Sequence, residues 1–344
     1  MKKNILLILF IALQPALHAQ FDNVGTSAMN FLKIGVGARG IAMGSSQVAS
    51  VNDATALYWN PSGIANLTAN QVLLSNNNWI ADLSHNFLAA VVPAGEFGVI
   101  GVSVSYLSMG DMKVTDWDNT YGTGQTFSAN SAAIGIGWAR HMNDRFMVGV
   151  QLKLLHESIA NTTANSFAVD VGSQYDIGWL RLGMSLQNFG PQTRLEGRDL
   201  LIRTDPLTEV GSNPSDVTAN LETQNWSLPI VFQIGVAVTP YRGEYFRLST
   251  SVDYRDERDY RAQTMMGAEF VVQEMVFLRG GVRNRVVSTV SNSTIDIEQE
   301  YLLSAGIGVV YGIPTTDLVV HFDYAFQELA FFNNSQLISV AFDF

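Results

Sequence analysis

Residues 146–155 read Phe-Met-Val-Gly-Val-Gln-Leu-Lys-Leu-Leu, so apolar side chains alternate with small or polar ones over most of this segment. A period of two is that of a β-strand, whose successive side chains point to opposite faces. The same alternation recurs in residues 246–255 and 318–327. One face of each segment is mostly apolar, whereas the other mixes small, polar and charged side chains. This division predicts strands that face lipid on one side and a polar lumen on the other, as in a membrane β-barrel.

The chain after residue 69 divides into fourteen such segments and the connections between them. Hydrophobic residues make up 47% of the sequence and charged residues 15%, yet beyond the N-terminus no segment has the length of a transmembrane helix. We therefore predict an all-β fold, a transmembrane antiparallel β-barrel of about 14 strands, because a single-chain bacterial barrel needs an even number. The predicted strands lie near residues 70–79, 84–92, 96–108, 126–140, 145–158, 164–177, 179–188, 226–238, 244–256, 260–272, 275–284, 301–310, 316–327 and 335–344.

The connections between these strands alternate in length. Short turns are followed by longer segments, of which the longest are residues 110–125, 190–225 and 285–300. Short periplasmic turns and long external loops are the usual asymmetry of outer-membrane barrels. The pattern predicts a multi-pass protein of the cell outer membrane, surrounded by outer-membrane lipid, with both termini periplasmic. The chain also ends in an aromatic residue, Phe344, as the last strand of such barrels typically does.

The N-terminus has the pattern of a secretory signal peptide. Lys2 and Lys3 precede an apolar run over residues 5–13, and the small residue Ala19 offers a cleavage site. We predict a signal peptide over residues 1–19, a plug segment over 20–68 and the barrel over 69–344. The chain holds 20 basic and 31 acidic residues, which argues against nucleic acid as a partner. It has no cysteine, which excludes a lipid anchor on cysteine, a disulfide framework and a thiolate metal site.

The plug segment does not have the chemistry of a strand. Pro61 keeps Asn60 out of the helical region and ends any helix begun at Asp53, while the Asn60 side chain can bond the freed backbone groups. Its glycines let the chain turn tightly and lie close to the barrel wall. We expect a helical plug in the lumen, which either only fills it or moves as a hatch. The residues assigned to the plug motif are Gly37, Arg39, Gly40, Gly44, Asp53, Asn60 and Pro61.

Charged side chains also fall on the inward face of the predicted strands. Their mixed signs predict an ion-pair network that neutralises the lumen and holds the plug. Arg39 needs a carboxylate there, which Asp53 or a wall residue such as Asp170, Asp253 or Asp323 could supply. The predicted lumen charges are Lys153, Asp170, Arg181, Arg247, Asp253, Arg255, Glu269, Arg279 and Asp323, with Arg283 and His321 on the same face.

No pattern in the sequence indicates catalysis, a metal site or a cofactor. Residues 35–40 match the Gly-x-Gly-x-x-Gly dinucleotide fingerprint in letters, but they lack the βαβ context that the fingerprint requires. The mature histidines have no metal-ligand spacing: His85, His141, His156 and His321. We expect a protein that is not an enzyme and needs neither metal nor cofactor.

The plug segment carries a resemblance to a known family. The runs Phe31-Leu32-Lys33-Ile34, Gly37-Ala38-Arg39-Gly40, Asp53-Ala54-Thr55-Ala56 and Trp59-Asn60-Pro61-Ser62-Gly63 resemble the PorV/PorQ family of Bacteroidota outer-membrane proteins. That family belongs to a wider group with the FadL long-chain fatty-acid transporter, a 14-stranded barrel with an N-terminal hatch. The resemblance implies a FadL-like fold and a role in the type IX secretion system. Its implied partners are the translocon, attachment proteins or the secretion domains of cargo proteins, bound through extracellular loops.

The resemblance leaves two functions open. The Asn60-Pro61-Ser62-Gly63 stretch is similar in the fatty-acid transporters, so it does not separate protein export from the transport of hydrophobic small molecules across the outer membrane. A pocket of Leu, Phe and Met side chains under the loops would favour transport of a hydrophobic ligand. A closed lumen with exposed apolar residues on the loops would favour a protein partner. The long connection 190–225, rich in proline and acidic residues, is where we expect such a partner to bind.

Overall fold

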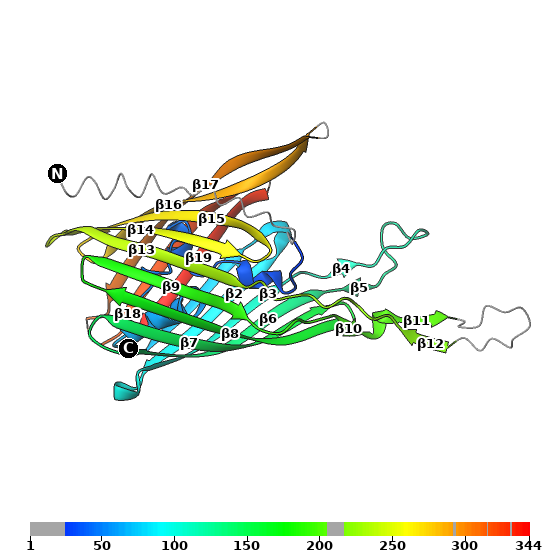
Figure 1. The fold of residues 1–344 in the computed structure, drawn as a ribbon, viewed down its shortest axis with the longest axis horizontal. Coiled ribbons are helices and arrows are strands. Elements are labelled where there is room, and N and C mark those ends of the chain that lie inside the picture. Colours follow the sequence, from blue (N-terminus) through cyan, green and yellow to red (C-terminus); the bar gives the residue numbers. More distant parts are fainter. Residues whose placement is uncertain (1–24, 205–216, 292–293, 315, 331) are drawn as a thin grey trace, which may run out of the picture.

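The chain forms a closed antiparallel β-barrel (Figure 1). The computed structural model describes residues 25–204, 217–291, 294–314, 316–330 and 332–344. The main sheet of these ranges has 15 strands, and setting aside the two-residue β10 (Glu196–Gly197) leaves the 14 strands of the wall. The wall strands are β1 (Gln71–Asn78), β2 (Ser84–Pro93), β3 (Val99–Ser108), β6 (Ala129–His141), β7 (Phe146–Ile159), β8 (Thr162–Asp176), β9 (Leu180–Phe189), β13 (Val231–Arg242), β14 (Phe246–Glu257), β15 (Tyr260–Val272), β16 (Val276–Ser291), β17 (Thr294–Gly312), β18 (Val319–Leu329) and β19 (Phe332–Asp343).

The first and last strands close the ring. β1 pairs with β2 on one side and with β19 on the other, in a register that sets Gln71 opposite Asp343. Asn70 and Phe344 extend this seam through two further backbone hydrogen bonds. The all-β barrel of 14 strands that the alternation predicts is thereby confirmed.

The long connections contain more strand than the sequence suggested. Residues 285–300 were expected to form a loop, but residues 285–291 pair with residues 294–300 as an extension of the β16–β17 hairpin, from Arg285 opposite Glu300 to Ser291 opposite Thr294. Short ribbons also form in the other two, β4 (Met112–Lys113) with β5 (Thr126–Phe127) and β11 (Leu201–Thr204) with β12 (Val217–Asn220). Alternation of apolar residues identifies strands that face lipid. These arms extend past the wall (Figure 1), where no lipid imposes that alternation, so the sequence pattern did not reveal them.

The two faces of the wall differ as the alternation predicts. On β7, Leu152 and Leu154 point outward and are 46% and 63% exposed, whereas Gln151 points inward and is 2% exposed. The same division holds on β6, where Ile134 and Ile136 are outward and exposed and Ala133 is buried. The outer surface is therefore an apolar belt suited to hydrocarbon, and the inner surface contacts other parts of the chain.

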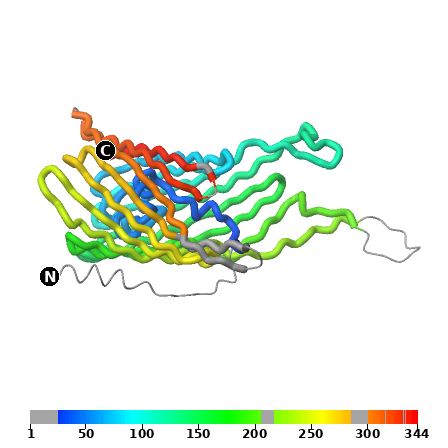
Figure 2. The backbone as a smooth tube through the Cα atoms, turned by 90° about the horizontal axis from the view of Figure 1, so that it is seen from above, coloured from blue at the N-terminus to red at the C-terminus, as the bar shows by residue number. Residues whose placement is uncertain are grey.

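Residues 25–70, called here the lumen segment, run inside the barrel (Figure 2). They form only short helices: η1 (Asn30–Lys33), α2 (Ala38–Ala42), α3 (Ala56–Trp59) and η2 (Pro61–Asn66). Trp59, Ile41 and Leu57 of this segment are among its largest fully buried side chains, and they pack against inward residues such as Leu73 and Phe87. In the described ranges no helix has both the length and the apolar character needed to cross a membrane.

The two ends of the described chain lie at opposite ends of the barrel. Gly25 donates to the carbonyl of Asp259 in the β14–β15 turn, and Ser27 bridges to Ser227 just before β13, both at the end with the long connections. Phe344 lies at the other end, beside the short turns η4 (Gly95–Phe97) and 142–145. Residues 1–24 lie outside the described ranges, so the signal peptide and the placement of the N-terminus stay predictions. The remaining short elements are η3 (Ile80–Asp82) and η5 (Arg198–Leu200).

Inward-facing glycines of the wall let the lumen segment press directly on the strands. A β-carbon at Gly149 would overlap the backbone of Pro61 and Ser62, and one at Gly281 would overlap the backbone of Met43 and Gly44. Such positions recur on most wall strands, and each would meet the lumen segment: Gly101, Gly137, Gly149, Gly172, Gly183, Gly235, Gly267, Gly281 and Gly306. We call this set the glycine girdle. At Gly149, Gly183, Gly267 and Gly281 it brings main chain against main chain, and at the other positions a side chain of the lumen segment occupies the space that a β-carbon would need.

The glycine girdle makes a prediction with a built-in control. Gly281→Ala should lower the free energy of unfolding by roughly 1–3 kcal/mol, the usual cost of overpacking, because the methyl group meets the lumen segment. Gly280→Ala, the next residue on β16, places its methyl group in open space and should change stability little. The temperature at which the folded barrel converts to the unfolded band on a denaturing gel measures both. Equal stability of the two variants would contradict the packing role.

Candidate functional site

Asn60 holds the centre of the lumen segment. Its side chain is fully buried, and its amide nitrogen donates to the carbonyls of Val48 (2.7 Å) and of Ser173 on β8 (3.1 Å). Its amide oxygen accepts from the backbone N–H of Ser62 (3.2 Å) and from the Ser62 hydroxyl (2.7 Å), capping η2 as Pro61 begins it. One side chain thus joins two turns of the segment to the wall, and it does so with both the donor and the acceptor of its amide.

The lumen segment also bonds the seam where the barrel closes. The backbone N–H of Ala38 donates to the Ser339 hydroxyl of β19 (2.8 Å), and that of Gly37 donates to the Ser75 hydroxyl of β1 (3.3 Å). Ser339 in turn donates to Ser75 (2.9 Å) across the seam. The first turn of α2 is therefore fixed to both strands that close the ring.

Arg39 joins α2 to a charge network on the wall. Its guanidinium lies 3.1 Å from Asp53 and 3.4 Å from Glu269 of β15. Glu269 also pairs with Arg279 of β16 at 2.8 Å, and Arg279 contacts Asp323 of β18. Glu269 and Arg279 are almost fully buried, so each guanidinium and carboxylate depends on the others for its charge to be compensated.

Of the four carboxylates that the sequence offered as partners for Arg39, the structure pairs only Asp53 with it. Asp53 contacts it, whereas Asp323 pairs with Arg279. Asp170 pairs instead with Lys153 at 2.7 Å, and Asp253 accepts from the backbone N–H of Val48 at 2.8 Å. The wall contributes Glu269 to Arg39, a partner that the sequence placed in the lumen without connecting the two residues.

Arg247 belongs to the same network, because it lies 3.8 Å from Glu269, and it also pairs with the exposed Glu274 at 2.9 Å. The remaining predicted lumen charges form separate contacts, and Arg255 pairs with Glu257 at 2.7 Å. Further pairs stand at the two ends of the lumen: Arg181 with Asp176 and His321 with Asp343 at the short-turn end, and Lys33 with Asp259 at the other. The charges are therefore several local clusters rather than one network.

The lumen below the long connections is filled by apolar residues of the chain itself. Met29, Phe31, Leu32 and Ile34 are buried there. They pack against wall residues that include Ala133, Leu155, Ala164 and Ala168, and against Leu228. A hydrophobic ligand bound at this level would have to displace them.

The long connections form a crown above the barrel mouth, defined here as residues 109–128, 190–204 and 217–230. Trp117 is 99% exposed and Tyr121 is 94% exposed, at the tip of the arm carried by β4 and β5. The tip is ordered by Asp116, whose carboxylate accepts from the backbone N–H groups of Asp118 (3.0 Å) and Asn119 (2.6 Å). On the second arm, Glu196 and Glu222 raise the pKa of Arg194 through hydrogen bonds and charge.

Several of these functional features were not found by sequence reasoning. The glycine girdle was missed, although its members share the inward phase of the alternation. The Lys33–Asp259 pair joins residues far apart in sequence, and the aromatic tip lies in a segment without periodicity. In the described ranges no group of three or more His, Cys, Asp or Glu side chains is placed to hold a metal ion.

Comparison with solved structures places the fold. The chain is similar to the CymD monoaromatic hydrocarbon channel, with a TM-score of 0.57 and 13% identity over 92% of this chain and 98% of that one. It is also similar to the Pseudomonas putida toluene transporter TodX, with a TM-score of 0.55 and 12% identity over 90% of this chain and 97% of that one. For a Pseudomonas aeruginosa FadL homologue the TM-score is 0.54, with 12% identity over 90% of this chain and 98% of that one. These likenesses show the FadL-like fold.

A closed barrel with an apolar outer belt and a filled lumen defines the class: this is an outer-membrane β-barrel protein with the FadL-like fold. No curated protein matches the chain. The family model described as Type IX secretion system protein PorV matches residues 17–199, more than half of the sequence. The chain belongs to this PorV family, as the resemblance in the lumen segment implied.

The charge network predicts the effect of one neutral substitution. Glu269→Gln should lower the free energy of unfolding by about 1–3 kcal/mol, because Arg39 and Arg279 each lose one carboxylate and keep a second one. Glu274→Gln is the matched control, since Glu274 is exposed and its pair with Arg247 contributes little. Denaturant unfolding in detergent, followed by tryptophan fluorescence, gives both values. A control that loses as much stability would contradict the assignment.

Proposed function

We propose that this protein is a non-enzymatic accessory barrel of type IX protein secretion, which holds a protein partner at its outer face through the crown. Membership of the PorV family supports the association with this secretion system. The partner is an exported cargo protein, the translocon or an attachment protein. In this proposal the crown is extracellular, and the short turns and Phe344 are periplasmic, which is the usual asymmetry of such barrels.

The observation that carries the proposal is the aromatic tip of the crown. Trp117 and Tyr121 leave almost their whole surface in water, although both are large and partly apolar. Burying such side chains is strongly favourable, and tryptophan and tyrosine are enriched among the residues that dominate protein interfaces. The turn hydrogen bonds of Asp116 hold the tip in one conformation, which reduces the entropy lost when a partner binds.

The filled lumen supports a partner over a transported molecule. CymD and TodX are described as a hydrocarbon channel and a toluene transporter, so transport of apolar molecules is the alternative that their fold suggests. Here Met29, Phe31 and Leu32 occupy the apolar space below the crown. The segment beneath them is held by Asn60, by the seam serines and by the glycine girdle. A moving hatch would have to break all of these contacts.

The proposal predicts which residues retain the partner. Tagged barrel purified from outer membranes should retain type IX secretion proteins, identified by mass spectrometry of its bound proteins and lipids. The double variant Trp117→Ala/Tyr121→Ala should reduce their recovery at least tenfold, as expected when about 1.4 kcal/mol or more of binding free energy is lost.

The control uses the same pair of residue types at the opposite rim. Trp179 and Tyr245 are 58% and 55% exposed beside the short turns, and Trp179→Ala/Tyr245→Ala should leave recovery unchanged. If the wild-type barrel and the crown variant recovered equal amounts of type IX secretion proteins, the aromatic tip would be excluded as the binding site. Apolar molecules that co-purify without any protein partner would overturn the proposal and favour transport.

A further inference from the structure

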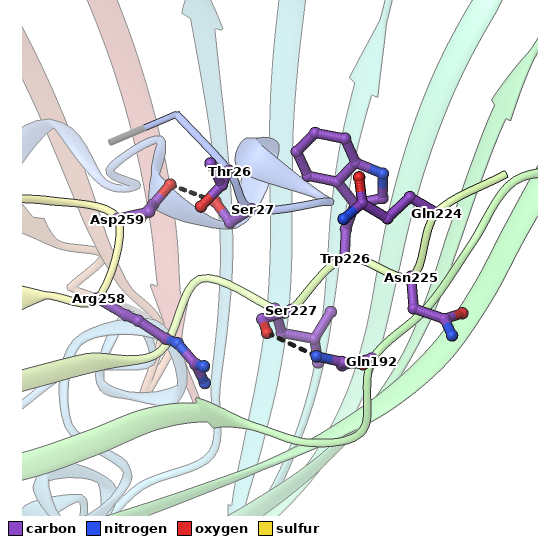
Figure 3. Close-up of a pocket in the computed structure, with 10 residues that line it drawn as sticks. Thr26, Ser27, Gln192, Gln224, Asn225, Trp226, Ser227, Arg258 and Asp259 are labelled. Carbon is purple, nitrogen blue, oxygen red and sulfur yellow. Dashed lines mark hydrogen bonds between the residues drawn. The ribbon is translucent and has the colours of Figure 1, made fainter. Parts of the chain in front are cut away.

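A polar cavity of about 320 Å³ lies at the crown end of the barrel, apart from the aromatic tip (Figure 3). Three segments form it: the start of the lumen segment (Thr26, Ser27), the crown (Gln192 and residues 224–228) and the β14–β15 turn (Arg258, Asp259). Backbone pairing joins two of them, because Ser27 bridges to Ser227 and Ala28 donates to the Ser227 carbonyl at 3.0 Å. The cavity is therefore a built feature of the fold rather than a gap between loops.

Asp259 is the buried polar group of this cavity. Its side chain is 2% exposed, and one carboxylate oxygen, Oδ2, contacts the ammonium of Lys33 (2.8 Å) and the Ser27 hydroxyl. The other oxygen, Oδ1, has no hydrogen-bond partner in the described part of the chain. A buried carboxylate oxygen without a partner is costly. Oδ1 has less than 1 Å² of exposed surface, so a ligand hydroxyl reaches it as an acceptor only with a small displacement of the lining.

The rest of the lining offers donors, acceptors and one aromatic ring. Gln224 and Asn225 are exposed and each carries an amide that both donates and accepts. Arg258 is exposed, and its guanidinium makes no hydrogen bond or ion pair to the described residues. The indole of Trp226 is 39% exposed beside them. We propose that this cavity binds a neutral saccharide, with the amides and Asp259 on its hydroxyl groups and Trp226 against the C–H face of the sugar ring.

Other ligand classes fit the lining less well. An apolar ligand would leave the amide, hydroxyl and charged groups of the lining without hydrogen-bond partners. A phosphate or carboxylate ligand would have Arg258 as its one cationic partner in the lining and would leave the amides of Gln224 and Asn225 largely unused. A cation would compete with Lys33 for the Asp259 carboxylate. An extended peptide needs free backbone groups along an edge. Here Thr193 and Trp226 already pair through both of their N–H groups, at 2.9 and 2.8 Å.

The size of the cavity agrees with this ligand class. Small-molecule sites range from about 300 to 1,000 Å³, so about 320 Å³ corresponds to one or two sugar rings. The ligand is a free sugar or one unit of a longer glycan, such as the carbohydrate of lipopolysaccharide in the outer leaflet. Both sources present the same hydroxyl chemistry, and the experiment separates them. The inference concerns a different surface from the aromatic tip, and only its lipopolysaccharide source rests on the extracellular placement of the crown in the proposed function.

The test measures binding to the full barrel in an amine-oxide detergent, which has no sugar headgroup. The probes are methyl glycosides of glucose, galactose, mannose and rhamnose, intact lipopolysaccharide, and the lipid-free polysaccharide released from it by mild acid. Binding is followed by calorimetry and by quenching of tryptophan fluorescence. We expect at least one glycoside or the lipid-free polysaccharide to bind, and Trp226→Ala to weaken binding about tenfold or more.

Two further variants complete the test. Gln224→Ala/Asn225→Ala should also weaken binding, and it changes only exposed side chains, so it keeps the test valid if Trp226→Ala fails to fold. Trp179→Ala, at the opposite rim, should bind as wild type does. Binding of the lipid-free polysaccharide as tightly as intact lipopolysaccharide identifies a glycan, and binding of the glycosides alone identifies a free sugar. Binding of intact lipopolysaccharide alone, unaffected by these variants, would overturn the proposal, as would the absence of any saccharide binding.

Discussion

A strand that crosses hydrocarbon has no water to satisfy its peptide groups, so every wall strand must be paired on both sides. The pairing of β1 with β19 satisfies the last unpaired strand edges and closes the sheet into a ring. A ring of this size encloses a lumen, which the chain fills with its own residues 25–70. The glycine girdle, the buried Asn60 and the charge cluster around Glu269 are all consequences of packing a second piece of chain inside that ring.

The filling differs between the two ends. Toward the short turns the lumen segment combines apolar packing of Ile41, Leu57 and Trp59 against the wall with the charges of Arg39, Asp53 and Glu269, which compensate one another. Toward the crown it is held by apolar packing of Met29, Phe31 and Leu32. The polar contacts fix the position of the segment, because charged groups inside a barrel are stable only beside their partners. The apolar packing excludes water and leaves the crown as the surface that faces other molecules.

The part of this structure that the sequence predicted is the part that lipid dictates. Hydrocarbon on one side forces the period of two, so the strand count and the inward phase of Lys153 or Asp253 can be found from residue types alone. The register between strands leaves no such trace, which is why Glu269 was placed in the lumen without being assigned to Arg39. The arms extend past the wall, where nothing imposes alternation, and the paired residues 285–291 and 294–300 were therefore taken for part of a loop. Close contact between main chains was missed for a different reason: the alternation places Gly149 and Gly281 on the inward face, but no residue type shows that the backbone of the lumen segment lies against them.

The lumen segment passes through the ring from one end to the other, from Gly25 beside the crown to Asn70 beside the last residue. This threading constrains the order of assembly. Either the segment is in place when β1 meets β19, or it must be drawn afterwards through a closed pore that it fills. In the first case Gly37 and Ala38 present two backbone donors to Ser75 and Ser339, one on each strand that is about to join. The segment would then act as an internal template that aligns the seam, and the register of the finished barrel would be set in part by a piece of chain that never enters the sheet.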